Sequence, residues 1–276
     1  YIGNVESSNH KVFWEFGNPK LPNRHMLIQG KSGQGKTYFI QRIIKELSQQ
    51  GVSTLIIDYT DGFKKKELEN EFKSDLKDKL KIYNVIKDKF ALNPFKRNLI
   101  ELDEDEYYPE DNNSIASRFK STISSVYSKL GPQQLNVVYQ SVLNGIEKYG
   151  EDMNLNILKN ELIADDTSQA GTVLNQLNEL LDKNPFDAVE KFDWSLLNKG
   201  KGNVIIVQLT GLSKDIQKII AEFVLWDLWN YKEQNGDVDN PFAIVLDEAH
   251  NLDFRSSAPA GKILIEGRKH GWAGLF

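Results

Sequence analysis

Continuous apolar runs alternate with segments of helical periodicity along most of the chain. The clearest runs are Thr54–Asp58, 204–209 and Phe242–Leu246. Apolar runs of this length are typical of parallel strands that are buried on both faces of a sheet. Further strands are predicted at 25–29 and, in part, at 271–276. The alternation therefore predicts an α/β fold in which helices flank a mainly parallel sheet.

Helices are predicted wherever apolar residues return every three or four positions. Residues 39–47 show this spacing, and Gly51 follows as a terminator. Residues 68–80 carry leucine or phenylalanine at every fourth position among many charges, which predicts a surface helix with one buried stripe. Ser213 is a candidate cap for a further helix over 216–228.

Helical spacing also dominates the middle of the chain, from 114 to 183. Ser114 is a candidate cap for the first of these helices, Gly131 stops it, and Pro132 suits the first turn of the next. Residues 101–111, just before them, hold seven acids without periodicity and predict a solvent-exposed loop.

These patterns divide the chain into three parts. Residues 1–92 and 199–276 are predicted to be the two halves of one core, and residues 93–198 a mostly helical insertion between them. Because the last strand pattern is still running at the final residue, we expect the chain to be a fragment, or a domain cut close to its C-terminal end.

Composition narrows the class of protein. Lys and Arg number 34 and Asp and Glu 39, a net charge of −5, which excludes a basic protein that coats nucleic acid. No apolar run approaches the roughly 18 residues of a membrane-spanning helix, and the first residues lack a signal-peptide pattern, so a soluble protein is predicted. The chain has no cysteine. Without cysteine, the chain cannot form disulfides, cysteine zinc sites or thiol nucleophiles. This composition favours a reducing compartment such as the cytoplasm.

The segment after the strand at 25–29 matches the phosphate-binding pattern G-x-x-x-x-G-K-[ST] at every fixed position. In such a loop, backbone N–H groups surround phosphate oxygens and the amino end of the following helix adds a favourable field. Lys36 is expected to reach the outer phosphates of ATP, and the Thr37 hydroxyl to bind Mg²⁺. The predicted phosphate-binding residues are Gly30, Lys31, Ser32, Gly33, Gln34, Gly35, Lys36 and Thr37.

An acid pair follows the apolar strand Phe242–Leu246. Asp247 stands at the carboxyl end of this strand, where it can support Mg²⁺, and Glu248 can polarise a water for attack on the γ-phosphorus. Hydrolysis of ATP is therefore expected. We further expect the pair to lie opposite the phosphate-binding loop, across neighbouring strands.

His250 completes the tetrapeptide Asp-Glu-Ala-His, which is known from one family of RNA helicases. We discount a helicase of that kind, because 211 residues separate Lys36 from Asp247 and we expect no partner motif of a second motor domain to fit after it. His250 is interpreted as a polar neighbour of the γ-phosphate or a local contact. Four histidines without a clustered pair do not favour a zinc site.

Arg268 lies in a basic turn just before the last predicted strand. An exposed arginine there can cross into the nucleotide of a neighbouring subunit and neutralise charge on the γ-phosphate, as an arginine finger does. The alternative is a solvated basic turn.

Taken together, several short motifs occur in a familiar order. They resemble those of the HerA/FtsK superfamily of DNA-pumping ATPases, and within it the ATPases of phosphorothioation-dependent DNA restriction. The motifs are 23–37, 56–58 with Gly62 and Phe63, 92–95, 204–212, 247–252 and 266–269.

This resemblance implies a RecA-like P-loop NTPase core, a ring of six subunits, and ATP hydrolysis coupled to movement along double-stranded DNA, with other restriction-system proteins as partners. By motif, it implies that Lys36 and Thr37 bind phosphates and Mg²⁺, that Asp247 supports the metal and that Glu248 activates water. Arg268 becomes the candidate for the finger that acts in trans. Superfamily members also place a polar sensor, usually Gln, after the strand that begins near 271, and this chain ends at Phe276 before such a residue.

Two other functions share the same core. One is a secretion-type ATPase that acts on protein, and the other is a regulatory switch that binds ATP without turnover. The acid pair at Asp247 and Glu248 argues against the switch, because a switch has little use for a water-activating carboxylate. A GTPase is disfavoured because the segment 198–201, Asn-Lys-Gly-Lys, lacks the acid that reads guanine.

Overall fold

The structure is a computed structural model that describes residues 1–18, 20–31, 33–103, 106–187 and 192–276. Its helices and strands follow one another as β1 (Gly3–Asn4), β2 (Lys11–Val12), α1 (Lys36–Gln49), β3 (Thr54–Asp58), α2 (Asn70–Leu76), β4 (Leu80–Asn84), α3 (Val85–Asp88), β5 (Leu99–Asp103), β6 (Glu106–Pro109), α4 (Asn112–Val126), α5 (Pro132–Tyr149), α6 (Leu155–Ala164), α7 (Ser168–Lys183), β7 (Val204–Gln208), α8 (Lys214–Asn235), β8 (Phe242–Leu246), α9 (Pro259–Glu266) and β9 (Trp272–Leu275). Short 3-10 turns occupy Lys77–Lys79, Gly150–Asp152, Trp194–Leu197, Ala249–Asn251 and Gly267–His270.

The centre of the molecule is a parallel sheet with the strand order β4-β7-β3-β8-β9. The three apolar runs are confirmed as β3, β7 and β8, and every residue of these strands is buried. Because the strands are parallel, their carboxyl ends meet at one edge of the sheet. Asp58 pairs with Gln208 in register, and Ile57 pairs with Leu246, so Asp247 follows directly beside Asp58 at this edge.

The segment that leads into the glycine-rich loop runs along the outer side of β9. The Met26 N–H donates to the Gly274 carbonyl at 2.8 Å, and the Phe276 N–H donates to the Met26 carbonyl at 3.0 Å. A single isolated bridge, between Met26 and Leu275, joins this segment to β9. The strand predicted at 25–29 is therefore an extended segment and not a regular strand. β9 separates it from β8. The expectation that the loop and the acid pair stand on neighbouring strands is therefore wrong.

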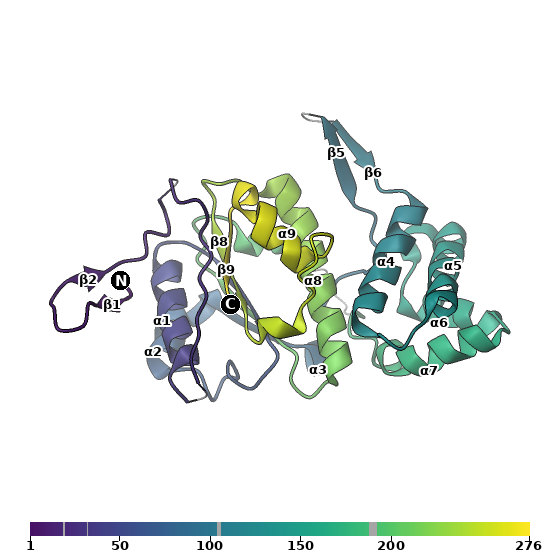
Figure 1. Cartoon of the computed structure of the whole chain (residues 1–276), viewed down its shortest axis with the longest axis horizontal. Helices are drawn as coiled ribbons and strands as arrows, with labels where there is room; N and C mark the ends of the chain where they lie inside the picture. Colours follow the sequence, from purple (N-terminus) through teal and green to yellow (C-terminus); the bar gives the residue numbers. More distant parts are fainter. Residues whose placement is uncertain (19, 32, 104–105, 188–191) are drawn as a thin grey trace.

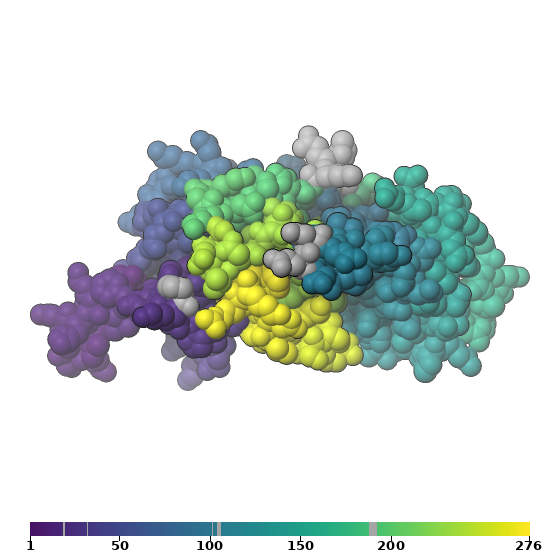
Figure 2. Space-filling view, turned by 90° about the horizontal axis from the view of Figure 1, so that it is seen from above, coloured from purple at the N-terminus to yellow at the C-terminus, as the bar shows by residue number. Residues whose placement is uncertain are grey.

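Helices cover both faces of the sheet, as predicted (Figure 1). Side chains alternate across the pleat, so Ile56 joins Ile44 of α1 and Phe72 of α2 in a core on one face. Leu55 points to the other face and joins Phe223 of α8, in a larger core that also takes in α4, α5 and α9. Figure 2 shows the N-terminal residues at one end of the molecule and the helices of the middle segment at the other.

The middle of the chain is largely helical, and α4 to α7 pack on one another with α4 against α8. Pro132 lies in the first turn of α5 as predicted, but α4 ends at Val126, before the Gly131 that was expected to stop it. The cap of α4, however, is Asp111, whose carboxylate accepts from the Ser114 N–H at 2.7 Å. The boundaries at 92/93 and 198/199 stay a prediction. Among the described residues, no helix has the length and apolar character needed to span a membrane.

The surface helix predicted over 68–80 is shorter than expected. α2 ends at Leu76, because Lys77 takes a positive φ of 43° that an α-helix cannot continue. Leu80 then opens β4, which pairs with β7. The buried stripe itself is confirmed for Leu68, Phe72 and Leu76.

The loop predicted over 101–111 is in fact mostly a β-hairpin, formed by β5 and β6. Its exposure to solvent is as expected, since Leu102 is 62% and Tyr108 63% exposed. The acids that suggested a loop are flanked by apolar and aromatic residues that favour strands, such as Ile100 paired with Tyr108.

Candidate nucleotide-binding site

The glycine-rich loop leads directly into α1, and the N-terminus of this helix is open. Gly33 and Gly35 have φ values of 79° and 80°, a left-handed backbone that residues with a Cβ rarely adopt. Gly35 is the N-cap of α1, no side chain caps the helix, and its first turn holds no acid. The first amides of α1 therefore lack intrahelical and side-chain acceptors among the described residues, which is the arrangement that binds phosphate. Ser32 lies outside the described residues.

Lys36 and Gln34 tie the loop together. The Lys36 ammonium donates to the carbonyl of Gly30 at 2.8 Å and to that of Lys31 at 3.3 Å. The Gln34 side chain accepts from the Lys31 N–H at 3.0 Å. The Lys36 side chain thus folds back over the loop, where phosphate oxygens are expected to compete with these carbonyls.

The loop that follows β3 contacts the surroundings of both residues predicted to hold Mg²⁺: Gly62 lies near Thr37, and Thr60 contacts Asp247. A Cβ placed on Gly62 would lie 3.6 Å from Thr37 Oγ1 and 3.4 Å from Thr60 Oγ1. The Thr60 hydroxyl in turn donates to Asp247 Oδ2 at 3.1 Å. A hydroxyl and a carboxylate from opposite elements are oxygen ligands of the kind that Mg²⁺ prefers, so these residues fit the ion.

The electrostatics of Asp247 link it to the loop. Burial raises the pKa of Asp247 and the Glu248 carboxylate raises it further, while the Thr60 hydroxyl and the Lys36 ammonium lower it. The Lys36 charge thus acts on Asp247 across β9. A bound divalent cation would favour the ionised carboxylate much more strongly than these groups do.

Asp58 is a site residue to which the sequence gave no role. It is fully buried at the end of β3, and burial raises its pKa to about 7, with the Asp247 charge acting in the same direction. Its carboxylate accepts from the Thr60 N–H at 3.1 Å and from the Phe63 N–H at 3.2 Å. One signal was available: Asp58 is an acid at the carboxyl end of a buried apolar run, as Asp247 is.

The loop between Asp58 and Phe63 is also held from two other elements. The Gln208 side chain, at the end of β7, donates to the Phe63 carbonyl at 3.0 Å. Gln217 of α8 donates to the Tyr59 carbonyl at 3.3 Å. This support fixes Thr60 between Thr37 and Asp247, and periodicity could not reveal it because the partners are more than a hundred residues apart.

Glu248 lies immediately beyond Asp247 in a strained conformation. Its φ of 59° and ψ of 44° are left-handed, which is uncommon for a residue other than glycine. Its side chain is 44% exposed, and its Oε2 lies 3.2 Å from His250 Nδ1. His250 therefore makes the local contact that was one of its two interpretations.

Arg268 lies in the turn Gly267–His270 and is exposed. It lies beside a second arginine, Arg24, whose pKa is lowered by burial and by the Arg268 charge. The Arg24 side chain is only 4% exposed and donates to the Phe16 carbonyl at 2.7 Å. The proximity of these two positive charges was not predicted, because nothing in the spacing of the two residues indicates it.

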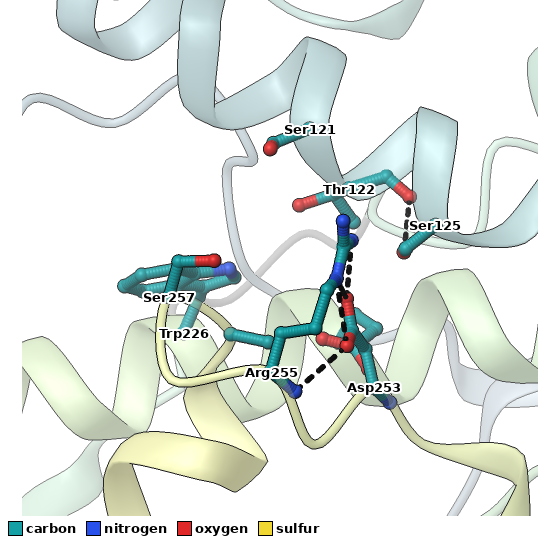
Figure 3. A pocket seen from close by; sticks show the side chains of 9 residues that line it. Ser121, Thr122, Ser125, Trp226, Asp253, Arg255 and Ser257 are labelled. Carbon is teal, nitrogen blue, oxygen red and sulfur yellow. Dashed lines mark hydrogen bonds and ion pairs between the residues drawn. The ribbon is translucent and has the colours of Figure 1, made fainter.

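A small polar cleft lies in the segment that follows the acid pair, between α4, α8 and residues 252–258 (Figure 3). Glu222 of α8 is 3% exposed, and its carboxylate accepts from the Asp253 N–H at 3.0 Å. Burial raises the pKa of Glu222 to about 7, and the Asp253 charge adds to this while Arg255 opposes it. The cleft is lined by Ser121, Thr122, Ser125, Glu222, Trp226, Asp253, Arg255, Ser257 and Ala258.

Replacing Glu222 by glutamine is expected to stabilise the fold at alkaline pH. Because the folded-state pKa lies above the ordinary value, the folded chain binds the extra proton, and its stability falls as the pH rises from about 4.5 to about 7. Glutamine can still accept from the Asp253 N–H, but it does not ionise. The variant should therefore not lose stability as the pH rises. Denaturant unfolding should give Glu222→Gln an advantage of about 2–3 kcal/mol at pH 8 that vanishes near pH 4.5.

The matched control is Glu233→Gln, an exposed acid on the same helix α8. It should leave the free energy of unfolding unchanged at both pH values. An equal effect of Glu222→Gln at pH 5 and pH 8 would show that ionisation of the buried carboxyl is not involved.

The sheet, the glycine-rich loop entering α1 and the acids at the carboxyl edge define a P-loop ATPase fold. The chain belongs to the family described as "Helicase HerA, central domain", whose profile matches residues 1–228. The resemblance to the HerA/FtsK superfamily is thereby confirmed at the level of a HerA-type P-loop ATPase.

Individual relatives agree with this family. The "DNA double-strand break repair helicase HerA" of Sulfurisphaera tokodaii is 26% identical over 260 residues, which cover 90% of this chain and 49% of that protein. The chain thus spans about half the length of this curated relative. VirB4 of Thermoanaerobacter pseudethanolicus has a TM-score of 0.67 at 16% identity, over 99% of this chain and 75% of that one. The plasmid coupling protein TrwB with ADP and Mg²⁺ has a TM-score of 0.54 at 15% identity, over 91% of this chain and 63% of that one.

Proposed function

We propose that this chain is the ATP-hydrolysing motor of a protein that moves along double-stranded DNA. The proposal is carried by the loop after β3, whose Gly62 lies near Thr37 and whose Thr60 contacts Asp247, together with the open N-terminus of α1. The description of its HerA relative as a DNA double-strand break repair helicase supports DNA as the track. TrwB with ADP and Mg²⁺ supports the choice of nucleotide and metal.

In this proposal each group has a separate task. ATP with Mg²⁺, when bound, supplies the phosphoanhydride and neutralises part of its charge. The loop amides and Lys36 orient the phosphates, while Thr37 and Asp247 hold the metal. Glu248 accepts the proton of the attacking water. Asp58 positions Thr60 and does not itself touch nucleotide.

We extend the proposal to the assembly and its cellular role. A ring of six copies would bring Arg268 of one copy to the nucleotide of the next, where its exposed guanidinium can act as the finger. The sequence motifs are most like those of the ATPase region of DptH, so we assign the motor to phosphorothioation-dependent DNA restriction, with other restriction proteins as partners and the cytoplasm as its location.

Turnover of ATP should rise several-fold when long duplex DNA is added to the chain with Mg²⁺. The physical reason is that a translocating motor completes its site only when subunits engage the track together. Phosphate release measured with and without a duplex of a few kilobases tests this, with Glu248→Gln as the inactive control.

Other outcomes assign other functions. A rate that ignores duplex DNA but rises with a protein partner favours the secretion-type ATPase. Bound ATP that survives intact for hours in the complete assembly favours the regulatory switch.

A further inference from the structure

Glu248 has a backbone conformation that needs support from its surroundings. Its φ of 59° is strained for a residue with a Cβ, and such a conformation persists only where the neighbouring structure holds it. On one side of Glu248, Leu246 is fixed in β8 by its pairing with Ile57. On the other side, Glu248 leads into residues 249–258, called here the anchor segment, which run to α9. What holds the anchor segment therefore also holds Glu248.

The first turn of the anchor segment folds back on Glu248. The Glu248 carbonyl accepts from the Asn251 N–H at 2.9 Å and from the Asn251 side-chain amide at 3.2 Å. The Leu252 N–H donates to the Ala249 carbonyl at 3.0 Å, and the Leu252 side chain is buried in the core. These bonds close residues 248–252 into one turn, so a fixed point just beyond this turn also fixes Glu248.

Glu222 of α8 is that fixed point. Its Oε1 accepts from the Asp253 N–H at 3.0 Å, across 31 positions of sequence, and its side chain is only 3% exposed. The cleft beside it has a volume of about 20 Å³, which leaves room for about one water (Figure 3). The bond is therefore a largely desolvated link between α8 and the anchor segment.

The second half of the anchor segment is held by its own contacts. The Asp253 carboxylate accepts from the Arg255 N–H at 3.0 Å and from Arg255 Nε at 2.8 Å. The Arg255 carbonyl accepts from the Ala258 N–H at 2.9 Å, immediately before α9. It also lies so close to Gly261 of α9 that a Cβ there would clash with it. The segment is thus packed from Glu248 to α9, and Glu222 ties its middle to α8.

The same helix supports the other loop of the candidate site. Gln217, in the first turns of α8, donates to the carbonyl of Tyr59 in the loop after β3. Glu222 follows five positions later and holds the segment after β8. Through these two side chains, α8 sets the loops after β3 and β8 relative to each other.

We propose that Glu222 is a positioning residue for ATP hydrolysis, which holds Glu248 in its left-handed conformation through the anchor segment. The inference rests on the proposed role of Glu248 as the group that activates water, but not on DNA as the track. The task of Glu222 is to accept one hydrogen bond, and it takes no part in the chemistry itself. Glutamine can accept the same bond, whereas leucine, of similar size, cannot.

The variants Glu222→Leu and Glu222→Gln test this role in the full chain with Mg²⁺. Single-turnover phosphate release gives the rate for each bound ATP, and a fluorescent ATP analogue gives the affinity. We expect Glu222→Leu to lower the rate about ten-fold and to change the affinity less than about two-fold, because a misplaced base does not loosen the phosphates. Glu222→Gln should keep most of the rate.

The combination with Glu248→Gln distinguishes positioning from general support of the fold. In that background, Glu222→Leu should leave the remaining slow rate unchanged, because the group that it positions can no longer act. If Glu222 only stabilised the fold, or acted through α9, the loss would persist in the double variant. That result would overturn the inference.

Two further variants provide a test if Glu222→Leu does not fold. Asn251→Ala removes the side-chain bond to the Glu248 carbonyl outside the core, and should lower the rate about three-fold, again only where Glu248 is present. Lys232→Met is the matched control, since Lys232 is the other buried charged side chain of α8 and its ammonium lies 4.4 Å from the ring centre of Phe242, at the amino end of β8. It should leave the rate for each bound ATP unchanged.

The inference and the proposed function can fail separately. If the parent chain hydrolyses ATP through Glu248 while Glu222→Leu and Asn251→Ala match it, the inference alone is refuted. If both variants lose activity as expected but duplex DNA leaves turnover unchanged, the DNA motor is refuted and the positioning role stands. A parent chain without turnover that depends on Glu248 refutes both.

Discussion

Replacing Glu248 by glutamine is expected to lower ATP turnover by about a hundred-fold to a thousand-fold while nucleotide still binds. Glutamine has the same shape and can occupy the left-handed position at the end of β8, but it cannot accept the proton of the attacking water. Single-turnover phosphate release gives the rate, and a fluorescent ATP analogue gives the affinity.

The matched control is Glu233→Gln, which removes an exposed acid from α8 and should leave both quantities unchanged. His250→Asn removes the ring that lies beside Glu248 and should cost far less than the loss of the carboxylate. Turnover that persists in Glu248→Gln would mean that another group, such as Asp58, activates the water.

Replacing Lys36 by alanine is expected to weaken ATP binding by about a hundred-fold, the effect of losing one or two hydrogen bonds from a charged donor. The ammonium now donates to the carbonyls of Gly30 and Lys31, so it already lies over the loop where the phosphates are expected. Titration with a labelled nucleotide measures the loss. Because Lys36 is only partly buried and lies outside the hydrophobic core, the free energy of unfolding should change little.

Lys31→Ala is the control for this variant. Lys31 lies in the same loop and carries the same charge, but it contributes only its backbone to the contacts of the loop. It should keep most of the affinity. An unchanged affinity in Lys36→Ala would place the triphosphate somewhere other than the amino end of α1.

The strands that build the site could be predicted because a strand that is buried on both faces needs an apolar residue at nearly every position. β3, β7 and β8 are buried at every position, and each appears as an unbroken apolar run. The expectation that the phosphate-binding loop and the acid pair stand on neighbouring strands was wrong. The place of β9 between Met26 and β8 depends on pairing across about 250 residues, which no local pattern encodes.

The residues of the site also fall into those that the sequence could reveal and those that it could not. Lys36, Thr37 and Asp247 were predicted as site residues from spacing alone, and their roles stay a prediction, although Thr60 links Asp247 to the loop that approaches Thr37. Asp58 and Thr60 could not be predicted, because their importance comes from burial and from contacts with distant elements. The hairpin was missed because its acids suggested a loop, whereas cross-strand pairs such as Ile100 with Tyr108 decide its structure.

The pairing of the Met26 segment with β9 has a consequence for how the protein is made. His25 Nδ1 accepts the Gly274 N–H at 2.9 Å, across 249 positions of sequence. A ribosome releases the phosphate-binding loop long before it delivers the strand that fixes that loop beside the acids. The nascent chain therefore has no complete nucleotide pocket until residue 276 has emerged, and ATP can stabilise the fold only after translation has passed that point.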